Sequence, residues 1–295
     1  MKRILLTGKN GQVGWELQRA LSVLGEVIAF DSKALNLAEP SAIRSLVQAS
    51  RPHIIVNAAA YTAVDKAESE PEVVDAVNGK GPEILAEEAR RSGATLVHFS
   101  TDYVFDGKSS TPYLETSPTA PLSAYGKSKL HGEQAIIDSQ CKHLIFRTSW
   151  VYANRGKNFM LTMLNLARSK PLLSIVNDQR GAPTWARSIA EGAAQVLSRT
   201  LNSHQEESWG IYNLTCSDQT TWFGFASAIF ELYRNLDPNF TIPELKAITT
   251  KEYPTPAQRP LYSVLDNRKV QNAFHVNLPH WKRALELCLQ ERFTS

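Results

Sequence analysis

The stretch RILLTGKNGQVGWEL, residues 3–17, decides the fold of this 295-residue chain. It joins a short apolar run to three glycines spaced three apart, and then to a helical pattern over residues 12–24. Such a turn lets the backbone approach a pyrophosphate, whose negative charge faces the start of the helix. The stretch therefore predicts a dinucleotide-binding unit built on Gly8, Gly11 and Gly14, and a glycine-rich turn without a ligand is the alternative.

Further apolar runs follow the first, and helical patterns lie between them. The runs are nearly continuous in apolar residues, as in parallel strands covered by helices on both faces. The alternation predicts an α/β fold, a Rossmann-type doubly wound parallel sheet. We expect these strands at residues 26–30, 53–59, 95–100 and 143–148.

Residues 1–150 are predicted to form the dinucleotide-binding domain, and 151–295 mostly a smaller C-terminal substrate-binding lobe. A strand and a helix within about 172–215 would rejoin the sheet. Because prolines cluster at residues 238–260, that stretch is predicted to be a loop.

Composition narrows the possible partners. The chain is 43% hydrophobic and 21% charged with a net charge of +3, which is ordinary for a globular protein and gives no argument for nucleic acid. No apolar run is long enough to span a bilayer or to serve as a signal peptide. Cys141, Cys216 and Cys288 lie far apart without a metal-type spacing, which indicates a reducing compartment. We expect a cytoplasmic protein with no nucleic-acid or membrane partner.

An acidic residue ends the second predicted strand. Asp31 lies about 20 positions past the glycines, where a carboxylate accepts hydrogen bonds from the adenosine ribose. It would repel a 2′-phosphate and so favours NADH, whereas Lys33 would offset that repulsion. The alternative is an aspartate that caps a turn.

Polar and small residues follow the third and fourth strands, where ligands bind in a doubly wound sheet. Ser100, Thr101 and Asp102 end the fourth strand, and a hydroxyl there would hydrogen-bond a substrate carbonyl. Small residues at 58–60 would let the backbone pass close to a cofactor. For each position by itself, a polar strand end or ordinary packing is the default explanation.

The segment AYGKSKLHGEQ, residues 124–134, reads as a helix with Ser123 as a possible cap. Tyr125 and Lys129 are four apart and share one helix face. A lysine ammonium favours the phenolate and lowers the tyrosine pKa, which suits a general acid. Most Tyr/Lys pairs at this spacing are merely exposed on a helix, so the surrounding motifs decide.

Those motifs together resemble a known family. The glycine turn, the acidic end of strand two, STDYVFDG (100–107) and YGKSKLHGE (125–133) resemble the extended short-chain dehydrogenase/reductase family. Longer strings resemble its dTDP-4-dehydrorhamnose reductase branch over nearly the whole chain: GQVGWELQRAL, RPHIIVNAAAYTAVDKAESEPE, HLIFRTSWVYA, VNDQRGAPTWA and YPTPAQRPLYSVLD.

The resemblance implies NADH- or NADPH-dependent reduction of the 4-keto group of dTDP-4-dehydro-β-L-rhamnose to dTDP-L-rhamnose. Tyr125 would donate the proton, and Thr101 would orient the carbonyl. Lys129 would lower the pKa of Tyr125 and bind the nicotinamide ribose. The other implied cofactor contacts are Gly11, Gln12 and Val13 at the pyrophosphate, Ala60, Tyr61 and Thr62 along the cofactor, and Asn36 and Leu37 at the adenine. The implied substrate contacts are Thr101, Asp102 and Trp150 at the sugar and Arg259 at the diphosphate.

The resemblance also implies a homodimer bridged by Mg²⁺. The matching positions are Glu16, Glu191 and Glu291, and magnesium takes oxygen ligands of this kind. Each glutamate is equally well explained as a solvated charge on a helix surface.

Two other functions are compatible with the scaffold. A nucleotide-sugar epimerase or dehydratase would share the motifs, although no glutamate directly follows Asp102, as a 4,6-dehydratase would need. A non-catalytic, reductase-like regulatory subunit is the other alternative, because fold alone does not fix function. Such a subunit would be expected to lose Tyr125, Lys129 or the glycines, and all are present.

Overall fold

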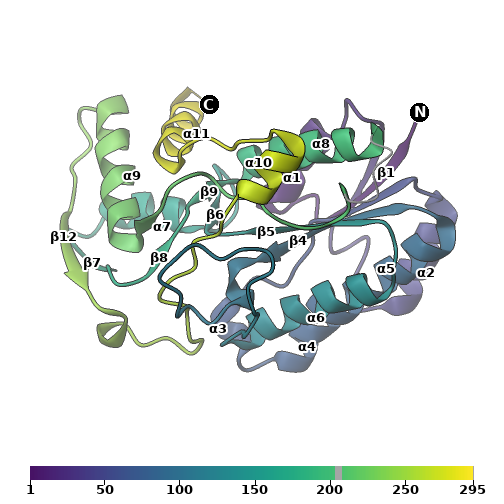
Figure 1. Ribbon diagram of the computed structural model, residues 1–295. Helices are drawn as coiled ribbons and strands as arrows, with labels where there is room; N and C mark the ends of the chain where they lie inside the picture. Colours follow the sequence, from purple (N-terminus) through teal and green to yellow (C-terminus); the bar gives the residue numbers. More distant parts are fainter. Residues whose placement is uncertain (203–207, 295) are drawn as a thin grey trace.

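A computed structural model describes residues 1–202 and 208–294. The chain forms a parallel sheet layered between helices, with a smaller lobe beside it (Figure 1). The six-stranded sheet has the order β10-β5-β4-β3-β1-β2, and all of its pairings are parallel. This confirms the predicted Rossmann-type fold. The strands are β1 (Arg3–Thr7), β2 (Glu26–Phe30), β3 (Ile54–Asn57), β4 (Thr95–Thr101), β5 (His143–Thr148) and β10 (Gly210–Asn213).

Helices cover both faces of the sheet, which explains why its strands are apolar almost throughout. One face packs on α1, α8 and α10, and its core includes Ile4, Phe146 and Ile189. The other face packs on α2, α5 and α6, with Leu5 and Ile145 in its core. The helices on these faces are α1 (Gln12–Ala20), α8 (Ala186–Asn202), α10 (Arg268–Phe274), α2 (Pro40–Ser50), α5 (Gly81–Ser92) and α6 (Ala124–Asp138).

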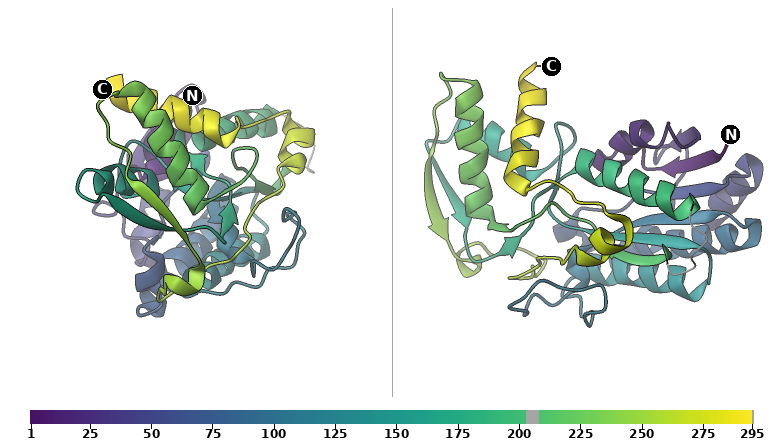
Figure 2. Two further views of the ribbon diagram at one scale, coloured as in Figure 1. Left: turned by 90° about the vertical axis from the view of Figure 1, so that its left-hand side faces the viewer. Right: turned by 45° about the horizontal axis from the view of Figure 1, so that its top comes forward.

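The smaller lobe lies beside the sheet, as Figure 2 shows. It has a separate core around α7, α9 and α11. Its larger elements are α7 (Phe159–Ala167), β7 (Leu172–Val176), α9 (Trp222–Leu236), β12 (Glu244–Ile248) and α11 (Trp281–Thr294). Short strands connect the lobe to the sheet: β6 (Val151–Tyr152), β8 (Arg180–Gly181), β9 (Thr184–Trp185) and β11 (Thr220–Thr221). In the described part of the chain, no helix has the length and apolar character needed to cross a lipid bilayer.

The loop predicted over residues 238–260 is wrong in its middle. Residues 244–248 form β12, which pairs in parallel with β7. The prolines that suggested a loop flank this strand, so they mark its two ends rather than a continuous loop.

The helical pattern after β3 is broken by a wide turn. Two short helices, α3 (Val64–Ala67) and α4 (Pro71–Asp75), lead into a π-helical turn over Ala76–Lys80, and α5 follows it. Wide turns of this kind are frequent at functional sites. Here the turn buries Asn78.

A buried ion pair anchors α6 to β5. The Arg147 guanidinium donates to both carboxylate oxygens of Glu133, through Nε at 3.0 and 3.2 Å and through Nη2 at 2.6 Å. Arg147 Nη1 also donates to the carbonyl of Glu115. Both side chains are almost fully buried, so each charge depends on the other for compensation.

We therefore expect Glu133→Gln to lower the free energy of unfolding by about 3 kcal/mol, because Arg147 stays buried without its counter-charge. Urea unfolding followed by circular dichroism measures this. Glu286→Gln is the matched control, because Glu286 pairs with Arg283 on the surface, and it should cost less than about 0.5 kcal/mol. Equal losses in the two variants would contradict the role given to the buried pair.

Candidate active site

The glycine turn after β1 packs directly against the end of β3. Gly8 has φ +75°, and a Cβ atom there would lie 2.6 Å from the backbone nitrogen of Ala59. A Cβ atom on Gly14 would overlap the carbonyl oxygen of Gly8. The turn therefore has no room for side chains at these two glycines, and the start of α1 stays open to an anion.

Gln12 ties the start of α1 to the smaller lobe. Its side-chain oxygen accepts a hydrogen bond from Asn158 Nδ2 at 2.8 Å, and Asn158 caps α7. Val13, the next predicted cofactor contact, packs partly against the core of the sheet.

A buried amide holds the second wall of the predicted cofactor site. Asn78 accepts from the backbone N–H of Tyr61 at 2.8 Å and donates to the Tyr61 carbonyl at 3.0 Å and to Ser128 Oγ at 3.1 Å. It thereby fixes the predicted segment 60–62 against α6. Asn78 is not among the predicted site residues, and its one signal in the sequence is that Gly79, Gly81 and Pro82 follow it and break the helical spacing.

Asp31 lies beside the glycine turn, as predicted, and also caps its own turn. Its carboxylate accepts from the backbone N–H groups of Lys33 and Ala34, each at 3.1 Å, and from Asn10 Nδ2 at 3.2 Å. Lys9 Nζ lies 3.7 Å away. The hydrogen bond from Ala34 is the largest influence that lowers the Asp31 pKa. Lys9, rather than Lys33, therefore supplies the nearby positive charge.

The two residues predicted at the adenine differ in their surroundings. Asn36 is exposed, and its side-chain oxygen accepts from the backbone N–H of Ala38 at 3.0 Å. The Leu37 side chain is buried in the core with α2 and α5, and so contributes to packing.

Polar groups converge at the end of β4. Thr101 donates from Oγ1 to Asp102 Oδ1 at 3.1 Å and accepts from the backbone N–H of Tyr103, which caps a short 3₁₀ turn over Asp102–Val104. Burial raises the Asp102 pKa to about 6, against the lowering effect of the Ser263, Thr101 and Ser149 hydroxyls.

Two further buried hydroxyls at this edge, Ser100 Oγ and Thr148 Oγ1, have no hydrogen-bond partner within the described residues. Unpaired buried hydroxyls are costly, and they are typical of a surface built to meet a polar ligand.

Tyr125 lies at the start of α6, beside Thr101. The Ser123 hydroxyl caps the helix by accepting from the Gly126 N–H, as predicted. The ring of Tyr103, a residue that the sequence analysis missed, packs edge-on against Tyr125 with centroids 5.8 Å apart. Desolvation raises the Tyr125 pKa to about 12, while the Thr101 hydroxyl lowers it and Asp102 raises it further.

Lys129 is buried beneath this site. Its Nζ donates to the carbonyl of Phe99 at 2.6 Å and lies 3.0 Å from His98 Nε2. Burial lowers the Lys129 pKa to about 8, although Glu133 raises it. The ammonium therefore contacts β4 rather than the phenol, and the lowering of the Tyr125 pKa that we expected from Lys129 is not observed.

His98 continues this contact across the sheet. Its Nδ1 lies 3.0 Å from Asn57 Nδ2, and Asn57 Oδ1 accepts from Thr7 Oγ1 at 2.6 Å. Burial, together with the Lys129 charge, holds the His98 pKa well below its usual range. A chain of close polar contacts thus runs from Lys129 to the residue that precedes the glycine turn. The sequence analysis missed His98 because a histidine inside an apolar strand gives no signal by itself.

The predicted sugar contact Trp150 adopts a left-handed backbone conformation with φ 47°, uncommon for a large side chain. Its ring stacks on Trp222 at 3.5 Å with nearly parallel planes, and Gly181 leaves the space for it. Strained backbone of this kind clusters at functional sites.

Arg259, the predicted diphosphate contact, bridges the two parts of the molecule. Its Nη2 donates to Asp65 Oδ2 at 2.8 Å, in the segment after β3, and its Nη1 donates to the hydroxyl of Thr255. The structure thus brings Arg259 next to the β3 side of the site, with Asp65 as its counter-charge.

The predicted magnesium ligands do not fit a metal ion. Arg187 Nε donates to Glu16 at 3.1 Å, and Arg187 Nη2 donates to Glu291 at 2.6 Å, so a guanidinium lies between two of the three carboxylates. Within residues 1–202 and 208–294, no group of three His, Cys, Asp or Glu side chains is arranged to hold a metal. Within one chain these residues therefore give no support to the predicted Mg²⁺ site, and the homodimer stays a prediction.

Comparisons of the chain with family models, with related sequences and with solved structures all point to one family. The RmlD substrate binding domain family matches residues 1–293. The dTDP-4-dehydrorhamnose reductases of Escherichia coli K12 and Burkholderia thailandensis are 47% and 46% identical, and each alignment covers at least 98% of both chains. A crystal structure of the Bacillus anthracis dTDP-4-dehydrorhamnose reductase in complex with NADP is 35% identical, has a TM-score of 0.89, and covers 98% of this chain and 99% of that chain.

These matches span the glycine turn, the β4 edge, α6 and the smaller lobe alike, since they cover almost the whole chain. The chain belongs to the dTDP-4-dehydrorhamnose reductase family, whose RmlD substrate binding domain model it matches over residues 1–293.

Proposed function

We propose that this chain reduces the 4-keto group of dTDP-4-dehydro-β-L-rhamnose to dTDP-L-rhamnose. The observation that carries the proposal is the grouping of Tyr125, Thr101 and Asp102 at the end of β4, above a buried Lys129. The glycine turn ends β1, which is separated from β4 in the sheet by β3 alone. The full-length similarity to reductases that act on this sugar supports the same reaction.

The cofactor proposal rests on the fit of the glycine turn. Gly8 and Gly14 leave the backbone bare at the start of α1, as pyrophosphate binding requires, and the related Bacillus anthracis enzyme is in complex with NADP. A bound NADPH or NADH supplies the hydride. Asn78 holds the segment 60–62 that would line the cofactor on the opposite side.

Tyr125 is the proposed proton donor. Because burial raises its pKa to about 12, the phenol is protonated at neutral pH and can donate a proton. As negative charge develops on the sugar O4, Tyr125 gives up its proton there, and the Thr101 hydroxyl orients the same oxygen. Lys129, held beneath them by the Phe99 carbonyl, would bind the nicotinamide ribose.

The substrate proposal uses residues of both parts of the molecule. Asp102 would accept hydrogen bonds from sugar hydroxyls, and the stacked rings of Trp150 and Trp222 would form an apolar wall. Arg259 would reach the diphosphate, since its guanidinium carries a permanent charge that suits phosphate.

Tyr125→Phe removes only the phenol hydroxyl. We expect kcat to fall about 10²–10⁴-fold, the usual contribution of general acid catalysis, while the cofactor Kd stays close to the wild-type value. Oxidation of NADPH and of NADH, followed by absorbance with the dTDP sugar, measures kcat, and fluorescence titration measures Kd.

Tyr233→Phe is the matched control, because Tyr233 belongs to α9, outside the β4 edge, and its ring contacts Phe293 of α11. It should keep wild-type kcat. If Tyr125→Phe also did so, the proton would come from another group. If the wild type oxidised neither NADPH nor NADH, the reaction itself would be wrong.

The pH dependence of kcat/KM should show whether the reaction needs Lys129 in its charged form. A lysine is charged below its pKa, so kcat/KM, which reports groups of the free enzyme, should fall as the pH rises above about 8. Tyr125 does not cause this fall, because its pKa is about 12.

Lys129→Arg keeps a positive charge that titrates only above pH about 12. We expect the variant to be slower but to show no loss of kcat/KM between about pH 8 and about pH 10. An unchanged alkaline limb in this variant would assign the titration to a different group.

Asp31→Asn tests cofactor preference. The asparagine oxygen can still accept from the backbone N–H groups of Lys33 and Ala34, so the turn is preserved. Loss of the negative charge should raise kcat/KM for NADPH relative to NADH about fivefold, because a 2′-phosphate is no longer repelled. An unchanged ratio, measured with both cofactors at fixed ionic strength, would place the discrimination elsewhere.

A further inference from the structure

One arginine joins three helices that are distant in the sequence. Arg187 lies in the first turn of α8, and its Nε donates to Glu16 of α1 at 3.1 Å. Its Nη2 donates to Glu291 of α11 at 2.6 Å. Glu191 lies one turn further along α8, on the same helix face as Arg187. All three glutamates predicted to bind magnesium are thus grouped around one guanidinium.

The most buried member of this cluster needs a positive partner. The Glu16 side chain is only 9% exposed, whereas those of Arg187 and Glu291 are 32% and 37% exposed. A carboxylate that is removed from water is costly unless a charge or hydrogen-bond donors compensate it. The guanidinium supplies both, and it also lies over the ring of Trp185, 4.9 Å from the ring centroid.

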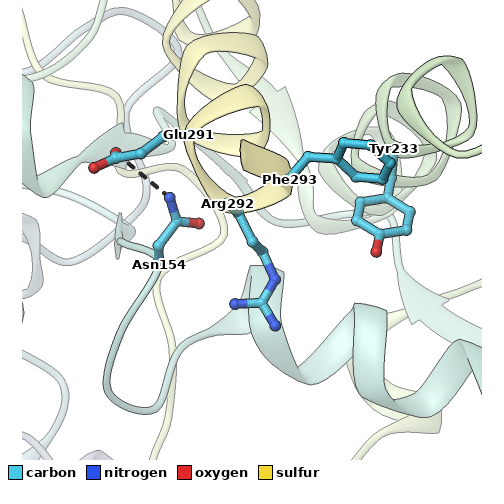
Figure 3. Close-up of a pocket in the computed structure, with 5 residues that line it drawn as sticks. All are labelled: Asn154, Tyr233, Glu291, Arg292 and Phe293. Atoms are coloured by element: carbon cyan, nitrogen blue, oxygen red, sulfur yellow. Dashed lines mark hydrogen bonds between the residues drawn. The ribbon is translucent and has the colours of Figure 1, made fainter. Parts of the chain in front are cut away.

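A second contact fixes Glu291 from the opposite side. Figure 3 shows its carboxylate beside Asn154, in the segment that follows β6. Asn154 Nδ2 donates to the Cys288 carbonyl at 2.7 Å and lies 3.5 Å from Glu291 Oε2. The last helix is therefore held to α8 by Arg187 and to this segment by Asn154.

We propose that Arg187 takes the place of a divalent cation in this cluster, so that α1, α8 and α11 are held together without metal. Magnesium needs oxygen ligands at about 2.0–2.1 Å in octahedral geometry. Guanidinium nitrogens at 2.6 and 3.1 Å from two of the available oxygens occupy that space and repel a second cation.

The guanidinium is a permanent cation, because arginine is not deprotonated in proteins. Its geometry also matches carboxylates through several parallel donors, which a spherical ion cannot provide. The cluster is therefore charge-compensated from within the chain. Glu16, the member of the cluster on α1, lies about one turn after the glycine turn. The same guanidinium therefore attaches the C-terminal helix to the helix that begins the proposed cofactor site.

The test is thermal unfolding of the full chain in EDTA and then in excess MgCl₂. The wild type should unfold within about 1 °C of the same Tm in both, because it gains no binding free energy from magnesium. Arg187→Met should lower the Tm by about 3–8 °C in both, since Glu16 loses its counter-charge. Arg187→Glu should lower the Tm in EDTA and regain part of it in MgCl₂, because a new carboxylate joins those of Glu16 and Glu291.

Arg283→Glu is the matched control, because it makes the same change of charge in an exposed pair with Glu286 on α11. It should change the Tm little and give no response to magnesium. A wild type that loses stability in EDTA and regains it with MgCl₂ would overturn the proposal, as would an Arg187→Met variant with the wild-type Tm. The wild-type measurement and the Arg187→Met measurement remain decisive if Arg187→Glu does not fold. Neither depends on the proposed reaction.

Discussion

The site depends on one constraint, the burial of the Lys129 ammonium. Removing such a charge from water costs several kcal/mol unless close partners replace the lost hydration. The Phe99 carbonyl and His98 are those partners, and both belong to β4. These two short contacts tie the Lys129 face of α6 to β4.

The contact between α6 and β4 also determines where the other residues of this helix face lie. Tyr125, Lys129 and Glu133 are spaced four apart, so they lie on one face of α6. Glu133 pairs with Arg147 of β5, and Tyr125 lies beside Thr101 at the end of β4. The two buried charges thus hold the face that presents the phenol. The chain through His98, Asn57 and Thr7 extends this order to β1, whose end carries the glycine turn.

The sequence was sufficient for the fold and for much of the site. Five of the six sheet strands are predictable from early apolar runs, because a strand buried on both faces has little freedom in composition. Tyr125 and Lys129 are predictable because helical spacing is local. The exact surroundings of Lys129 are not predictable from the sequence, because they depend on which residues of β4 face α6.

Pairings between residues distant in the sequence account for most of what was missed. Arg187 meets Glu16 across 171 positions and Glu291 across 104 positions, and no local pattern signals either contact. Asn78 and His98 act through partners on other elements in the same way. Leu37 shows what a motif leaves open, because its side chain lies in the core whether or not its backbone meets the adenine.

The return of the chain to the sheet has a consequence for how this protein can vary. After building part of the smaller lobe, the chain adds α8 to one face of the sheet and β10 to its edge, and then leaves again to complete the lobe. Neither part is one continuous segment, so neither can be exchanged as a cassette by a single crossover. The dinucleotide-binding part and the lobe therefore form one folding arrangement, in which each part depends on segments that the other separates in the sequence.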